Sequence, residues 1–237
     1  MTDHRVEDRN CDGCSVCCEY LTIDTPALRK LPDVLCPNCI RGSGCGIYDS
    51  RPDVCRDWYC GWRYLPVLDE SWRPDRAGVL ITVNDPRDRK DLPWSYKKSP
   101  AVVKFSVVDQ GRFRAHIEPF ISYMGGLIES GVPVFLAAST QGGHAHGKTF
   151  LNHGMIGAVL IRDYQRSVNE LLTALDVCRR HPGERISLHT TPFYRQLLNR
   201  VRRRRSIMYH YTITQDLRRI GVNRLFTECR RGRIQHP

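Results

Sequence analysis

Nine cysteines lie in the first quarter of this 237-residue chain, and their spacing constrains that region more than any other feature. Only Cys178 and Cys229 lie outside this group. The first block reads Cys11-x2-Cys14-x2-Cys17-Cys18, and the second reads Cys36-x2-Cys39-x5-Cys45-x9-Cys55-x4-Cys60. A C-x2-C step turns two sulfurs toward one centre, and an odd number of clustered cysteines fits a disulfide framework poorly. The spacing therefore predicts thiolate-ligated metal in residues 11–60.

The spacing leaves the kind and number of metal centres open. Three closely spaced sulfurs with a distant fourth are typical of a cubane iron–sulfur cluster, whereas four thiolates around one atom are typical of structural zinc. Cys17 and Cys18 are adjacent, and adjacent side chains diverge by about 100° in a helix and about 180° in a strand. We therefore expect that they serve two sites or that one of them packs without binding. One or two centres fit these observations, and iron–sulfur is favoured over zinc.

Composition and termini place the chain among globular proteins of the cytoplasm. Hydrophobic residues make up 41% and charged residues 26% of the sequence, as in ordinary folded domains. The first residues are polar and charged, without the apolar core of a signal peptide. No apolar run approaches the ~18 residues that a membrane span needs. Since the cytoplasm is reducing, clustered thiols there hold metals far more often than they form disulfides.

Three regions follow from the change of pattern along the chain. Residues 1–64 are predicted to be a cysteine-cluster metal-binding module, 65–100 an irregular connecting segment with one strand at 78–83, and 101–237 an α+β domain with basic C-terminal helices. The fold class is thus α+β, an irregular cysteine-rich module followed by a mixed α/β domain. In the second domain the patterns predict strands over 102–108 and 112–117 joined as a hairpin, a helix over 120–130, a buried strand over 132–138, and helices over 161–180 and 193–208.

Two segments of the module carry a family resemblance: Cys11-Asp12-Gly13-Cys14-Ser15-Val16-Cys17-Cys18, and Cys45-Gly46-Ile47-Tyr48-Asp49-Ser50-Arg51-Pro52-Asp53-Val54-Cys55-Arg56. Over roughly residues 10–62 the chain resembles the YkgJ-type cysteine-cluster family, whose CxxCxxCC domains are described as chelating zinc or iron. This resemblance implies eight ligands, and Cys39 is then the additional cysteine: Cys11, Cys14, Cys17, Cys18, Cys36, Cys45, Cys55 and Cys60. The module also looks like part of flagellin lysine methylases, which implies an iron–sulfur cluster. Nothing after residue 100 resembles such a methylase, so that activity is not expected here.

Residues beside the cysteines have expected roles of their own. Pro52 stiffens the approach to Cys55 because its ring fixes φ. Arg51 is expected to donate to carbonyls or to offset thiolate charge, unless it is a surface arginine. Trp58, Tyr59 and Trp62 are expected to shield the centre from solvent, although ordinary packing explains them equally well. Cys178 and Cys229 are interpreted as buried apolar side chains.

A glycine-rich segment with two histidines, Gln141-Gly142-Gly143-His144-Ala145-His146-Gly147-Lys148, is the most suggestive motif of the second half. Such a loop after a strand can bind a metal or a phosphate, with His153 as a third imidazole, or it is a flexible loop with exposed histidines. It is not a nucleotide-binding P-loop, since the first glycine lies at the wrong distance from Lys148. A metalloenzyme that combines the cysteine cluster with His144 and His146 is one alternative function.

The basic excess of the chain lies at its C-terminal end. Residues 185–237 hold 13 basic and 2 acidic side chains, while the whole chain has a formal net charge of +11. The run Arg202, Arg203, Arg204 and Arg205 is its densest part. Such a patch can bind nucleic acid or another polyanion. A zinc-stabilised binding module that uses this basic region is therefore the other alternative function.

Overall fold

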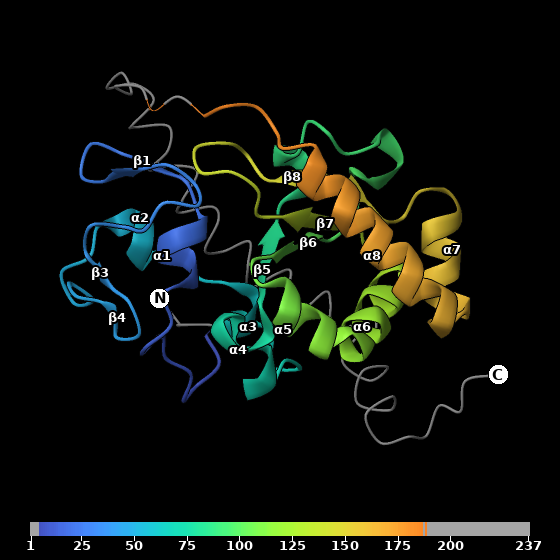
Figure 1. The fold of residues 1–237 in the computed structure, drawn as a ribbon, viewed down its shortest axis with the longest axis horizontal. Coiled ribbons are helices and arrows are strands. Elements are labelled where there is room, and N and C mark those ends of the chain that lie inside the picture. The colour runs from blue at the N-terminus through green and yellow to red at the C-terminus, as the bar shows by residue number, and fades with distance from the viewer. Residues whose placement is uncertain (1–4, 187, 189–237) are drawn as a thin grey trace.

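The computed structural model describes residues 5–186 and 188 (Figure 1). Short elements joined by turns make up the cysteine-rich part, as the scarcity of periodic apolar residues predicts. It contains helices α1 (Val16–Tyr20), α2 (Asp53–Arg56) and α3 (Gly61–Tyr64). Two antiparallel strand pairs lie between them, β1 (Ile23–Asp24) with β2 (Arg29–Lys30) and β3 (Cys39–Ile40) with β4 (Gly44–Cys45). We call residues 11–60 the cysteine module.

A four-stranded sheet of order β5-β6-β7-β8 forms the centre of the molecule. Its strands are β5 (Val79–Asn84), β6 (Val102–Val107), β7 (Val134–Ala138) and β8 (Gly147–Phe150). The central pair β6–β7 is parallel, and the two outer pairs are antiparallel. Strand β5 belongs to the segment 65–100, so this segment contributes one edge of the sheet. The segment also contains the 3₁₀ helices η1 (Glu70–Trp72), η2 (Pro86–Asp88) and η3 (Trp94–Tyr96) and the helix α4 (Pro74–Ala77).

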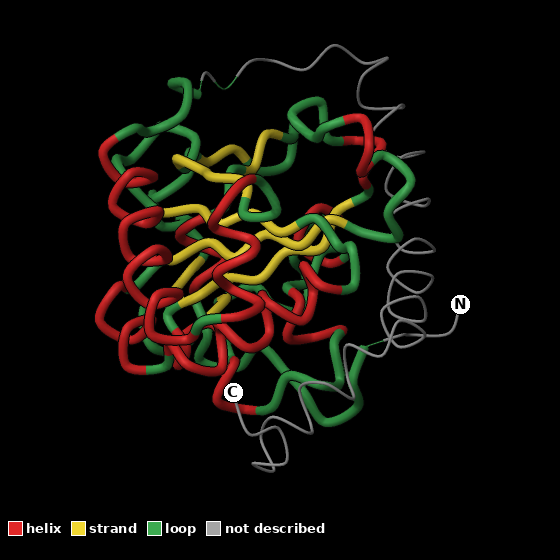
Figure 2. The backbone as a smooth tube through the Cα atoms, turned by 90° about the vertical axis from the view of Figure 1, so that its right-hand side faces the viewer, coloured by secondary structure: helices red, strands yellow, loops and turns green. Residues whose placement is uncertain are grey.

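Helices cover one face of the sheet. They are α5 (Gln110–Ala115), α6 (Ile117–Glu129), α7 (Gly154–Arg162) and α8 (Tyr164–Arg180). Figure 2, which looks from that side, has these helices on the near side of the strands. Phe105 of β6 packs edge-to-face on Tyr123 of α6, with ring centroids 6.0 Å apart. Both are fully buried, so the main core lies between the sheet and the helices, and the expected α+β class is confirmed.

The segment from η2 to η3 packs on the opposite face of the sheet. Leu92, Val102 and Phe135 form a small apolar cluster there, separate from the main core. Tyr96 of η3 packs edge-to-face on Phe150 of β8, with ring centroids 5.3 Å apart. Since strand side chains alternate between the two faces, residues of this second face are those that the helices do not reach. We call it the open face.

The predicted hairpin over 102–117 is wrong. The strand β6 is confirmed, but 110–115 is the helix α5, because the Asp109 side chain accepts a hydrogen bond from the Arg112 amide and caps the helix. The chain then crosses over through α6 and returns parallel to β6 as β7, as parallel pairing requires. The β-prone residues of 112–117 therefore pack as a helix within a crossover.

Other expected elements fare better. The helix at 120–130 corresponds to α6, the buried strand at 132–138 to β7, and the strand at 78–83 to β5. The helix predicted over 161–180 begins instead at Tyr164, where Asp163 accepts a hydrogen bond from the Arg166 amide and caps α8, while 161 and 162 end α7. The helix expected over 193–208 lies outside the described residues. None of the helices described is long and apolar enough to cross a bilayer.

Candidate metal centre

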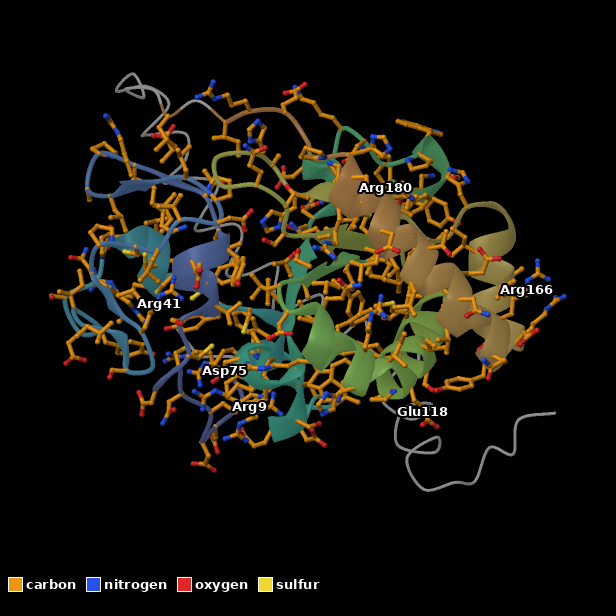
Figure 3. All side chains as sticks on the ribbon, viewed as in Figure 1. Arg9, Arg41, Asp75, Glu118, Arg166 and Arg180 are labelled. Atoms are coloured by element: carbon orange, nitrogen blue, oxygen red, sulfur yellow. The ribbon has the colours of Figure 1, made fainter. Side chains whose placement is uncertain are left out.

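Eight cysteines line a single cavity of about 240 Å³ in the cysteine module. They are Cys11, Cys14, Cys17, Cys18, Cys36, Cys45, Cys55 and Cys60. Cys39 is buried beside them but does not line this cavity. The volume far exceeds the ~10–15 Å³ that one water molecule needs. The sulfur atoms gather in the module in Figure 3. The structure thus brings together the eight cysteines that the family resemblance names.

Short local elements present these thiols to the cavity. Cys11 and Cys14 belong to one turn, closed by a bond of 3.0 Å from the Cys14 amide to the Cys11 carbonyl. Helix α1 carries Cys17 and Cys18, and the Cys18 carbonyl accepts from the Cys36 amide at 2.9 Å, which joins the two cysteine blocks. The strand pair β3–β4 holds Cys45, α2 holds Cys55, and Cys60 directly precedes α3.

Electrostatic contact divides the cysteines into two groups. The thiol of Cys60 is influenced by Cys11 and Cys14. The thiol of Cys55 is influenced by Cys18, Cys36 and Cys45. The first group therefore comes from the first turn and the start of α3, and the second from α1, β4, α2 and the loop before β3.

Cys17 and Cys18 do not point apart as the sequence predicts. Their thiols are hydrogen-bonded to each other, and Cys18 is also hydrogen-bonded to Cys39. The short helix α1 bends both side chains toward the same cavity. Cys17 therefore contacts the second group through Cys18, and adjacency in sequence does not by itself separate these two sulfurs.

Burial and the neighbouring sulfurs favour the neutral thiol in the protein alone. Burial raises the pKa of Cys14 to about 11 and that of Cys60 to about 12. Burial, followed by the influence of Cys18, raises the pKa of Cys55 to about 11. The hydrogen bond with Cys17, together with burial, raises the pKa of Cys18 still further. Thiolates in this cavity therefore require a cation among them, as a metal would supply.

The donor set fits a soft metal, although no ion-sized site is preformed. Within the residues described, no three His, Cys, Asp or Glu side chains converge closely enough to hold a metal ion. The polar donors that face the cavity are nevertheless mainly sulfurs, and thiolates select zinc, copper(I) and iron–sulfur clusters over hard cations.

Three buried cationic side chains accompany the cysteines. Lys30, Arg51 and Arg63 are at most 9% exposed, and none has a carboxylate ion-pair partner in the described part of the chain. Lys30 donates to the carbonyls of Glu19 and Leu31, both at 2.9 Å, and its charge acts on Cys36 and Cys18. Arg51 lines the cavity itself. A buried charge is costly when no opposite charge pairs with it, so a negative charge in the cavity would stabilise Arg51 and Lys30.

Aromatic side chains surround Arg51 and Arg63. The guanidinium of Arg51 stacks on Tyr48 at 3.8 Å and donates to the Tyr59 hydroxyl at 2.8 Å. Arg63 lies over the same Tyr59 ring at 5.3 Å. Trp58, Tyr59 and Trp62 line the cavity, as expected from the sequence, and Leu80 of β5 adds an apolar wall from the sheet. The sequence pointed to Arg51 through its place before Pro52, whereas no spacing signal marks Lys30 or Arg63.

The histidine loop lies apart from this cavity. His146 is largely buried, and its Nε2 lies 2.9 Å from Asp33 Oδ1. His144 forms an isolated bridge with Arg185, and His153 is an exposed residue whose ring packs edge-to-face on Phe150. None of the three lines the cavity. Cys178 is buried on α8 as expected, with 2% of its surface exposed. Cys229 and Arg202–Arg205 lie outside the described residues.

Comparison with known proteins adds no relative to this picture. No family model, no curated protein and no solved structure matches the chain. The assignment of the site therefore depends on its own residues.

Proposed function

We propose that the cysteine module binds one or two thiolate-ligated metal centres and that these are iron–sulfur clusters with a structural or redox role. The observation that carries this proposal is the cavity lined by eight cysteines and by the buried Arg51, with the buried Lys30 near enough for its charge to act on Cys18 and Cys36. Four thiolates around a metal centre carry a net negative charge, which Lys30 and Arg51 are placed to offset. The resemblance to the YkgJ-type family, made through the same cysteines, agrees with this reading.

The two electrostatic groups supply a ligand partition. Cys18, Cys36, Cys45 and Cys55 would hold one centre. Cys11, Cys14 and Cys60 would hold the other, with Cys17, the one cavity cysteine in neither group, as its fourth ligand. Four sulfur ligands suit either a cubane cluster or one zinc ion. The apolar and aromatic wall favours the cluster, because exclusion of water protects iron–sulfur centres and tunes their potential. The proposal includes a reducing cytoplasm, in which the thiols stay available to metal.

Metal analysis of the protein purified without oxygen tests this proposal. We expect a brown protein with broad absorption in the blue and about four irons and four sulfides per centre. Colourless protein with one zinc per four cysteines would replace iron–sulfur by structural zinc and keep the thiolate site. Folded protein that contains neither metal, and in which all eleven cysteines react as free thiols, would overturn the proposal.

Single substitutions test the ligand set. Cys→Ser at Cys11, Cys14, Cys55 or Cys60 should each lower the metal content, because a hydroxyl is a poor ligand for a soft metal. Cys39→Ser is the matched control within the module, and Cys178→Ser is the control in the sheet domain. Both should leave the metal content unchanged. A loss with Cys39→Ser as large as that with Cys55→Ser would show that the second centre uses Cys39.

A further inference from the structure

A lysine occupies the middle of the open face of the sheet. Lys104 lies on the inner strand β6 and pairs in register with Thr82 of β5 and Phe135 of β7. A charged residue on an inner strand is unusual, since such positions are normally apolar or paired. Lys104 is partly exposed, and its side chain has no hydrogen bond or ion pair with any other residue that the structure describes.

Two more cations lie beside this lysine. Lys148 follows Gly147 on β8 and pairs with Ala137, two residues after Phe135. Its side chain therefore lies on the same face of the sheet as Phe135. Gly147 fixes this orientation, because a Cβ at Gly147 would lie 1.9 Å from the Cys178 carbonyl of α8 on the helical face. Arg89, from the segment after η2, stacks on the Phe135 ring with its guanidinium carbon 4.5 Å from the ring centroid.

One carboxylate links two of the three cations. Asp91 accepts two hydrogen bonds from Arg89, at 2.9 and 2.8 Å, and its Oδ2 lies 2.6 Å from Lys148 Nζ. Burial of this carboxyl would raise its pKa, but the hydrogen bonds from Arg89 and Lys148 hold the pKa well below its ordinary value. Asp91 therefore stays ionised and compensates one positive charge. Two positive charges remain when Lys104 is protonated.

The electrostatics of Lys104 agree with an incomplete charge balance. Its burial, followed by the neighbouring charges of Arg89 and Lys148, lowers the pKa of Lys104 to about 8, and Asp91 only partly opposes this. An added anion would relieve the repulsion. The Lys148 side chain is 46% exposed, so a ligand can approach from that side.

We propose that Lys104, Arg89 and Lys148 form a binding site for the dianionic phosphate group of a small phosphate monoester. Such a group carries a charge of about −1.5 to −2 at neutral pH, which matches the two uncompensated charges better than a carboxylate does. Lysine and arginine are the usual phosphate-binding side chains. The site is distinct from the cysteine cavity, which neither Lys104, Arg89 nor Lys148 lines. Lys148, the last residue of the glycine-rich histidine segment, belongs to this proposed site.

Chemical protection tests the site without any substitution. The full-length protein, with its metal as purified, is treated with a limiting amine-reactive reagent, and modified lysines are mapped by mass spectrometry. Inorganic phosphate and glycerol phosphate should each slow modification of Lys104 and Lys148 by about fivefold or more relative to chloride at equal ionic strength. Lys90, an exposed lysine of the same segment, should react equally in all three salts. Equal protection of Lys90 and Lys104 would overturn the proposal.

Affinities measured by calorimetry separate a phosphate site from a purely structural ion network. Lys104→Gln should weaken binding of glycerol phosphate by about tenfold, the loss expected for one charge-assisted hydrogen bond. Lys148→Gln, at a more exposed position, should weaken binding as well. The conclusion then does not depend on correct folding of Lys104→Gln alone. Asp91→Asn should strengthen binding, because it removes the competing carboxylate. Weaker binding in Asp91→Asn, or unchanged binding in both lysine variants, would contradict the site.

Two controls assign the signal to these residues. Replacing Arg202–Arg205 with glutamine should leave the affinity unchanged, because the arginine run is a separate source of anion binding. Affinity in the unaltered protein should fall as pH rises from 7 to 9, since Lys104 loses its proton around pH 8 while Arg89 keeps its charge and Asp91 remains ionised. Phosphate itself becomes more fully dianionic over this range. An affinity that rises with pH, or that depends on the arginine run, would rule out the site.

Discussion

At the scale of single residues, Arg51 links the cavity wall to the charge that we assign to it. Its guanidinium lines the cavity, stacks on Tyr48 and donates to Tyr59, and its charge acts on Cys11. These contacts use both the planar face and the edge of the guanidinium, which a lysine cannot reproduce. Arg51 therefore both orders the aromatic shell and stabilises thiolates beside it.

Arg51→Gln should loosen the metal without removing a ligand. Loss of the neighbouring positive charge and of the tyrosine contacts is expected to increase the rate of metal loss to a chelator by about tenfold, the lower range for outer-shell substitutions at metal sites. Arg41→Gln is the matched control, because Arg41 belongs to the same module but is 69% exposed and paired with Glu19 at 3.3 Å. Equal rates of metal loss in the two variants would remove Arg51 from the site.

At the scale of elements, a buried carboxylate connects the cysteine module with the sheet. Asp33, which has a left-handed backbone with φ of 57°, accepts a hydrogen bond from the Ser139 hydroxyl after β7 at 2.9 Å and lies 2.9 Å from His146 before β8. Burial alone would raise the pKa of Asp33, but the hydrogen bonds of His146 and Ser139 hold it below its ordinary value. The ionised carboxylate is thus the form that joins the two parts.

Asp33→Asn should weaken this junction and make it insensitive to acid. Asparagine tolerates the left-handed backbone, so the change removes mainly the charge, at a cost of about 1.5–3 kcal/mol of unfolding free energy. Because the native pKa is lowered, the stabilisation is present above the unfolded pKa of about 4 and is lost as pH falls through the native pKa. Urea unfolding from pH 7 downward should therefore show the variant and the unaltered protein converging below pH ~4. Asp49→Asn, at an exposed carboxylate of the module, should change neither the stability nor its pH dependence.

The contact between β8 and α8 gives a second prediction at this scale. A Cβ on Gly147 would overlap backbone atoms of α8, so Gly147→Ala should destabilise the protein by about 1–3 kcal/mol. At Gly111 of α5, the nearest atom to a new Cβ is 3.4 Å away, and Gly111→Ala should stabilise the helix by up to about 1 kcal/mol. Thermal unfolding of both variants checks the expected opposite signs. A neutral Gly147→Ala would mean that β8 can shift away from α8.

The same elements show what the sequence can and cannot predict. The strands β6 and β7 follow from their apolar runs, since such runs depend on local composition. The parallel pairing of β6 with β7 does not follow from local composition. Asp109 caps a helix where its neighbours favour a strand, and the crossover is decided by packing of α6 on the sheet. At the site, cysteine spacing names the donors. The cation Lys30 comes from a position that only the fold brings beside them, so no local pattern reveals it.

At the scale of the whole molecule, the two ends of the cysteine module pack on the main core more extensively than its middle does. Its last residues belong to the main core, where Cys60 and Trp62 pack with residues of the sheet. Arg9 holds this end by donating to the carbonyls of Leu65, at 3.0 Å, and Trp62, and Figure 3 shows it beside α3 and α4. Near the start of the module, Val16 also belongs to that core, and Cys14, Tyr20 and Leu21 pack against it. Between residues 22 and 57 the module has a small apolar cluster of its own, formed by Ile23, Leu28, Cys36 and Cys39. Most of the module therefore depends on something besides apolar burial.

Removal of metal should consequently unfold the module and spare the sheet. Thiolate ligation couples metal binding to folding, and a cluster of four buried residues replaces little of that free energy. After chelation, hydrogen exchange should show loss of protection for amides of residues 22–57, including the Cys36 amide that donates to Cys18. Amides of β6 and β7 should stay protected, because both strands are paired on each side and none of their residues lines the cavity. Residues around Cys60 should exchange at an intermediate rate, since the main core holds them. Protection that persists throughout 22–57 after complete removal of metal would show that the module folds by packing alone, and the cysteines would then need a role other than holding the fold together.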